Sequence, residues 1–170
     1  MFRALEIARY TINYINNNSE EITNLKLQKL LYYTQAAFLV ETGEPCFLEP
    51  IICWQHGPVV KNVYDEFKTF EANPIPFQET VSKLVFENGM FKFEERPFQN
   101  PEMNSKQVDT INRVLNGLMR YSAWYLVDRT HEESPWKDME SAYNSEILTT
   151  NIKKYFLDEK NKERMYGKFS

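Results

Sequence analysis

Glycine is scarce in this sequence, and its few residues form no phosphate-binding loop. The 170 residues include 5 Gly, and neither GxGxxG nor GxxxxGK[ST] occurs among them. Both motifs use glycine to bring backbone N–H groups close to phosphates. The sequence therefore excludes nucleotide binding by these two routes.

Cysteine is equally scarce, and no long apolar run is present. Two cysteines are too few for a disulfide framework, so we expect a reduced, cytoplasmic location. The first residues, with Arg3 and Glu6, lack the apolar run of a signal peptide. No stretch reaches the about 18 uncharged apolar residues of a membrane span, so we expect no membrane association.

Ligands for a metal ion are few. Cys46, Cys53, His56 and His131 are the soft ligands, and only Cys53 and His56 have the two-residue gap common in zinc sites. A second tight pair is missing, so we expect neither a metal nor another cofactor. Cys53 or Ser134 could pair with a histidine as a nucleophile, but no GxSxG or HExxH motif occurs, and we expect no catalytic residue.

Both histidines have a structural interpretation. His56 lies at a predicted strand-to-helix corner, where an imidazole can hold a turn through hydrogen bonds to the backbone. His131 lies near a predicted helix C-terminus, where a positive charge interacts favourably with the helix dipole. Glu132 and Glu133 follow it, and we expect them to raise the pKa of His131.

Positive charge is not in excess. Lys and Arg total 20 and Asp and Glu total 24, which gives a net charge of −4. A protein that binds duplex DNA needs a basic face to displace counterions from the phosphates. Lys26 and Lys29 mark a helical face of the kind that is usually solvated, and acidic residues dilute the lysines of the C-terminal tail, so we do not expect nucleic acid to be the main partner.

Aromatic residues, in contrast, are abundant, and helical periodicity dominates the chain. With 12 Phe, 10 Tyr and 3 Trp, the chain can build an aromatic core. Thr23 or Asn24, Ser105 and Ser122 are predicted N-caps, and the stretch from 30 to 40 is apolar all round, which indicates a central helix. The predicted helices cover about residues 4–16, 24–42, 58–67, 105–118, 122–131 and 149–156, with a helical turn at Pro135 and Trp136.

The β structure is predicted to be small. Residues 46–48 and 51–55 are typical of short strands, and Pro58 suits the first position of the following helix. Asn88-Gly89 predicts a hairpin over 84–93, in which an apolar face is shared by Leu84, Phe86, Phe91 and Phe93. We therefore predict a mainly α, compact helical bundle with a small β element. We expect a single domain over 1–170, with a β- and Pro-rich insert at 71–104 and a charged tail at 158–170 that frays.

Several segments together resemble one family. They are LKLQKLLYY at 25–33, WQHGPVV at 54–60, SAWYL at 122–126, Thr130-His131 and Pro135-Trp136. Their order and spacing are similar to those of the Panacea domain, the family of SocA-like antitoxins and phage-associated GepA-type proteins. The resemblance covers about residues 4–156. The motif positions, structural or partner-binding, are Leu27, Gln28, Lys29, Leu30, Tyr32, Trp54, His56, Gly57, Pro58, Val59, Tyr64, Phe67, Trp124, His131, Pro135 and Trp136.

The resemblance implies a helical, non-enzymatic antitoxin. Such a protein neutralises a cognate protein toxin encoded nearby by direct contact, and one branch of the family delivers its toxin to a Clp-type protease. Members are frequent in prophages. Because aromatic side chains dominate interface energetics, Tyr10, Phe70, Met90 and Phe91 are further candidates for a partner surface.

Two alternatives from other classes stay open at this point. One is a phage- or prophage-encoded anti-defence or regulatory protein that binds nucleic acid. The other is a small hydrolase that uses His56 and His131.

Overall fold

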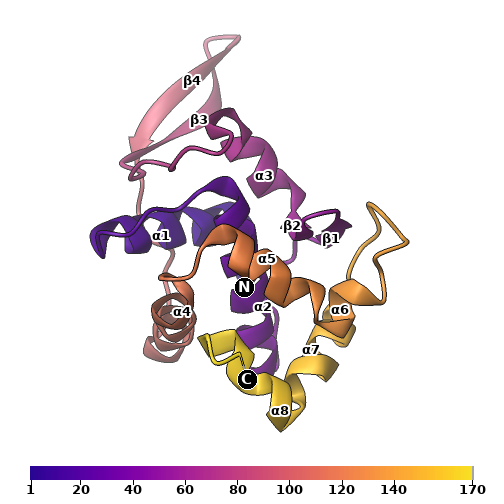
Figure 1. Cartoon of the computed structure of the whole chain (residues 1–170). Coiled ribbons are helices and arrows are strands. Elements are labelled where there is room, and N and C mark those ends of the chain that lie inside the picture. The colour runs from indigo at the N-terminus through magenta and orange to yellow at the C-terminus, as the bar shows by residue number, and fades with distance from the viewer. Residues whose placement is uncertain (170) are drawn as a thin grey trace.

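The computed structural model describes residues 1–169 and shows a compact, mainly α-helical protein with two small antiparallel strand pairs (Figure 1), as predicted. Helix α2 (Asn24–Glu41) lies at its centre and contacts most other elements. The Thr23 hydroxyl caps its first turn, and Gly43 follows its end with a φ of 85°. The cap is one of the two that the sequence predicted.

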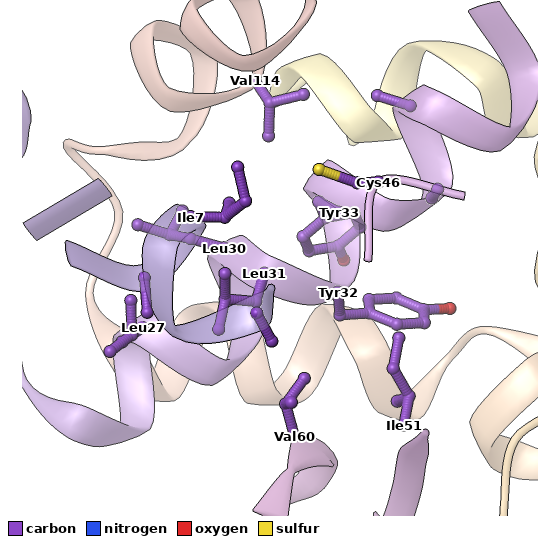
Figure 2. Close-up of a cluster of buried hydrophobic side chains, with 14 of the residues drawn as sticks. Ile7, Leu27, Leu30, Leu31, Tyr32, Tyr33, Cys46, Ile51, Val60 and Val114 are labelled. Carbon is purple, nitrogen blue, oxygen red and sulfur yellow. The ribbon is translucent and has the colours of Figure 1, made fainter. Parts of the chain in front are cut away.

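The core forms around α2 because this helix is buried on all sides and is largely apolar from Leu30 to Leu39. Tyr32 and Tyr33 are fully buried within it. Figure 2 shows Ile7 of α1 (Ala4–Asn17), Val114 of α4 (Ser105–Leu118) and Val60 around the α2 side chains. Figure 1 shows the remaining helices on the outside of this core. They are α3 (Lys61–Phe67), α5 (Ala123–His131), α6 (Ser134–Lys137), α7 (Thr149–Leu157) and α8 (Glu159–Lys162), with 3-10 turns at Lys68–Phe70 and Glu163–Tyr166.

The cap of α4 differs from the prediction. Asn104, not Ser105, is the N-cap, and its side chain accepts a hydrogen bond from the Gln107 N–H at 2.9 Å. Gln107 accepts one in return from the Asn104 N–H at 3.0 Å. This capping box needs a Gln or Glu three residues after the cap, and only Asn104 has one. The Ser122 cap of α5 is confirmed.

Pro58 does not begin a helix, which corrects the sequence prediction. It lies in strand β2 (Gly57–Val60), which pairs with β1 (Ile51–Trp54). Its partner Cys53 donates its N–H to the Ser145 carbonyl, on the side of β1 away from β2. In an antiparallel pair the hydrogen-bonding direction alternates along each strand, so Pro58 occupies a position where no N–H is needed. The helix begins at Lys61 instead. Of the predicted strand at 46–48, Phe47 forms an isolated bridge with Phe2.

The second hairpin has the predicted register. Strands β3 (Thr80–Glu87) and β4 (Met90–Pro97) pair Leu84 with Phe93 and Phe86 with Phe91, and extend beyond the predicted 84–93. Figure 1 shows this hairpin projecting away from the helices.

The C-terminal segment is folded against the core, whereas the sequence predicted a charged tail that frays. Residues 158–169 form α8 and the 3-10 turn Glu163–Tyr166, and Arg164 and Met165 are buried. Arg164 forms an ion pair with the buried Glu133, a residue 31 positions earlier in the chain. Ser170, the last residue of the predicted tail, lies outside the described residues. No helix within 1–169 is both long and apolar enough to cross a membrane.

Candidate functional site

The predicted motif positions that are not in the core gather around the β1–β2 hairpin. Gln28 and Lys29 approach it from α2, Tyr64 from α3, and Trp124 and His131 from α5. The buried motif residues are Leu27, Gln28, Lys29, Leu30, Tyr32, Gly57, Pro58, Val59, Phe67, Pro135 and Trp136. The motif residues therefore lie around the β1–β2 hairpin and in the core beneath it.

Gln28 fastens the end of the hairpin to α2. Its Oε1 accepts a hydrogen bond from the Val60 N–H at 2.9 Å, and its Nε2 donates to Asn24 Oδ1 at 2.9 Å. Asn24 in turn donates to the Tyr64 carbonyl at 3.0 Å. Because Gln28 and Asn24 are buried, these bonds are protected from water. The relay holds β2 and α3 at fixed positions on the central helix.

Lys29 supports the turn of the same hairpin. Its side chain is fully buried, and its Nζ donates to the Pro58 carbonyl at 3.0 Å. Gly57 lies directly above it with a φ of 99°. Burial lowers the pKa of Lys29 to about 7, so the amine is only partly protonated near neutral pH. Its role in the site is to fill the space beneath Gly57 and position the backbone there.

A stack of two rings supports the other side of the hairpin. His131 and Trp136 lie parallel with ring centroids 3.8 Å apart, and the Trp136 indole N–H donates to the Trp54 carbonyl at 2.9 Å. The pKa of His131 is lowered by burial and next by the nearby Lys29. The expected rise caused by Glu132 and Glu133 was wrong.

The two acidic residues are directed elsewhere. Glu132 pairs with Arg129 and Arg164, and Glu133 accepts hydrogen bonds from Arg164 and Tyr33 inside the core. Their charges therefore do not reach the imidazole of His131.

An open pocket of about 560 Å³ lies in front of the hairpin. We call it the hairpin pocket. It is lined by Asn24, Leu25, Gln28, Trp54, Gln55, His56, Val59, Tyr64, Lys68, Glu71, Trp124 and Tyr143. Trp54 and Tyr64 meet edge to face at 4.9 Å, and His56 and Trp124 do so at 5.1 Å. The Trp124 side chain is 57% exposed. The pocket thus presents aromatic surface on a rigid, hydrogen-bonded base.

The thiols and imidazoles of the chain are held by burial or by ring contacts. Within residues 1–169 no group of three or more His, Cys, Asp or Glu side chains is placed to hold a metal ion. Burial raises the pKa values of Cys46 and Cys53, so both remain thiols rather than reactive thiolates. The rings of His56 and His131 each contact a tryptophan. What remains accessible is aromatic surface with a few polar groups at the rim.

The four additional surface candidates lie in different places. Tyr10 is half-buried, and its hydroxyl donates to Asn112 Oδ1 at 2.8 Å. Phe70 is half-buried and packs on the core. Met90 and Phe91 are exposed at the end of the β3–β4 hairpin. None of the four lines the hairpin pocket.

Sequence reasoning missed four residues that line this pocket, namely Asn24, Lys68, Glu71 and Tyr143. Asn24 precedes Gln28 by one helical turn, and this spacing could have predicted their hydrogen bond. Tyr143 comes from the segment between α6 and α7, and no motif marks it. Its place in the pocket depends on the long-range hydrogen bonds between that segment and β1.

Comparisons with known proteins agree on one family. The family model described as "Antitoxin SocA-like, Panacea domain" matches residues 27–137, which include most of the residues that line the hairpin pocket. Antitoxin SocA of Caulobacter vibrioides (strain NA1000 / CB15N) is 33% identical over 118 residues, or 68% of this chain. The match spans 58% of the length of that relative. No solved structure matches significantly.

Proposed function

The chain belongs to the family of SocA-like antitoxins with a Panacea domain, and from this membership we propose that it is the antitoxin of a toxin–antitoxin pair. In this role it binds a cognate protein toxin, encoded nearby, and neutralises it by direct contact in the cytoplasm. The observation that supports a binding role is the hairpin pocket, where the motif residues present exposed aromatic surface.

The pocket has the properties of a protein-docking site. Trp and Tyr are enriched among the residues that dominate binding energy, and Trp54, Tyr64 and Trp124 supply three such rings. Their base is held by Gln28 and Trp136, so little conformational freedom is lost on binding. A volume of about 560 Å³ admits one or two apolar side chains of a toxin.

The same features support a non-enzymatic mechanism. The Cys53 thiol is buried with a raised pKa, and Lys29 is sealed beneath Gly57, so neither is presented to a substrate. The toxin is then inactivated by occlusion. Delivery of the bound toxin to a Clp-type protease is a finer form of this proposal that requires the same docking step.

Co-expression with the products of the flanking genes tests the proposal. We expect one product to arrest growth and the wild-type chain to restore it. Trp124→Ala removes an exposed anchor, so it should restore growth poorly and fail to retain purified toxin in a pull-down. Leu157→Ala, at a residue of α7 that is 52% exposed and outside the pocket, is the matched control and should behave as wild type.

Two results would contradict the proposal. The first is that no flanking product is toxic. The second is that Trp124→Ala and a Tyr64→Ala variant both bind toxin as tightly as the control does. Toxin abundance, measured in the same cells, separates occlusion from proteolysis, because only delivery to a protease lowers it.

A further inference from the structure

One face of the β3–β4 hairpin is apolar and uncovered. Leu84, Phe86, Phe91 and Phe93 share this face, and their side chains are 54%, 65%, 71% and 77% exposed. We call these four residues the apolar hairpin face. A contiguous apolar patch of this kind marks an interaction site on a soluble protein.

The rest of the chain does not cover this face. Strands β3 and β4 pack mainly against each other, and Figure 1 shows the hairpin standing away from the helices. The half-buried hairpin residues Val81, Val85 and Glu94 all lie on the opposite face. An isolated two-stranded hairpin is only marginally stable in water. The apolar hairpin face therefore requires a partner.

Charge indicates which partner fits. The four residues of the apolar hairpin face carry no charge, and Glu95 lies at the edge of the same side of the hairpin, two residues beyond Phe93. Three basic and three acidic residues make the whole hairpin neutral, namely Lys83, Lys92 and Arg96 with Glu87, Glu94 and Glu95. The chain as a whole has a net charge of −4, so two copies repel each other over most of their surface. The hairpin is a place where two copies meet without that repulsion.

The available area agrees with a pair of hairpins. Because a fully buried Phe covers about 150–250 Å², the three Phe and Leu84 offer on the order of 500 Å² per copy. Two copies together bury about 1,000 Å², the lower limit for a specific interface. Two twisted sheets pack face to face with interdigitating side chains, and Phe86 and Phe91, 4.9 Å apart, supply a ridge for this packing.

We propose that two copies of this chain form a symmetric dimer through the apolar hairpin face. Each copy covers the four residues of the other, and the charged opposite faces remain in water. None of the residues that line the hairpin pocket belongs to β3 or β4, so the pocket stays open in the dimer. The proposal does not depend on the toxin.

Light scattering after size-exclusion chromatography tests the dimer. Wild-type protein, followed from about 1 to 200 µM because interfaces of this size are weak, should approach twice the chain mass of 20.3 kDa. The double variant Phe86→Thr/Phe93→Thr replaces two rings with a β-branched residue that suits strands, and it should stay at the chain mass. Val81→Thr/Val85→Thr introduces the same residue type at two positions of the opposite face and should still dimerise.

Folding is controlled by circular dichroism and by a second variant. In that variant a short Asn-Gly turn replaces residues 80–97, which removes the face but leaves the helical core, and it too should be monomeric. A monomeric wild-type protein at the highest concentration would overturn the proposal. So would a Phe86→Thr/Phe93→Thr variant that dimerises as the wild type does. If the wild-type protein is monomeric and Phe86→Thr/Phe93→Thr no longer binds purified toxin, the apolar hairpin face is a toxin-binding surface and the dimer proposal fails.

Discussion

Gly57 lies directly against the ammonium group of Lys29. A Cβ atom on Gly57 would be 2.6 Å from Lys29 Nζ and 2.9 Å from Thr130 Oγ1. The absence of a side chain at Gly57 therefore lets a buried lysine reach the hairpin backbone. This contact joins the α2 motif segment to the hairpin motif segment and explains why the two occur together.

Gly57→Ala should destabilise the protein more than Gly43→Ala does, although both glycines have a positive φ. The substitution combines a left-handed backbone, which costs about 1–2 kcal/mol, with a steric conflict worth a further ~1–3 kcal/mol. Gly43→Ala is the control, since its φ is 85° but nothing lies within 4 Å of its Cβ position. Urea unfolding measures both, and equal losses would show that the Lys29 contact is unimportant.

Stability should rise with pH because of Lys29. Its pKa falls from 10.5 when unfolded to about 7 when buried, so the unfolded chain binds more protons between these values. The contribution of Lys29 is therefore least favourable below pH 7 and improves above it, by up to about 1.4 kcal/mol per pH unit. Lys29→Met should remove this rise. Urea unfolding gives the free energy of unfolding of both proteins at about pH 6 and pH 9. An equal change with pH in the wild type and in Lys29→Met would contradict the prediction.

Both cysteines should be unreactive in the folded protein. Cys46 and Cys53 are buried, and burial raises the pKa of each thiol, so little thiolate is present. Iodoacetamide at about pH 8 should modify neither one, whereas both should react in concentrated urea, where a free thiol has a pKa of about 8.5. Rapid alkylation of Cys53 alone in the folded protein would contradict the prediction and would support Cys53 as a nucleophile.

Local signals predicted much of this fold correctly. Asn88-Gly89 specified the register of β3 and β4, and the all-round apolar stretch of α2 indicated the central helix. Pro58 was misplaced because its preference for a helix start competes with strand pairing, and pairing is favoured here by the Gly57 turn and the bond from Gln28 to Val60. The preference of Pro58 for a helix start is therefore weaker than the pairing of β1 with β2.

The folded C-terminal segment could not have been predicted from local pattern. Its alternating charges are typical of a solvated tail, and the residue that fixes it, Glu133, lies 31 positions earlier. The motif marked most residues of the hairpin pocket as a group. It could not show that Trp54 and Trp124 are accessible while Trp136 is buried, because exposure depends on how α5 and α6 pack.

Arg164→Met should release the C-terminal segment and strongly destabilise the protein. Arg164 Nε donates to Glu133 Oε1 at 2.9 Å, and Glu133 is fully buried, so the variant leaves an unpaired carboxylate in the core. Breaking such a pair costs about 3–5 kcal/mol. The double variant Arg164→Met/Glu133→Gln removes the charge as well and should recover part of this loss. Urea unfolding measures the coupling, and limited proteolysis detects release of residues 158–169. The single variant Glu133→Gln completes the comparison. If the losses in free energy of unfolding of the two single variants simply add in the double variant, the Arg164–Glu133 pair does not hold the segment.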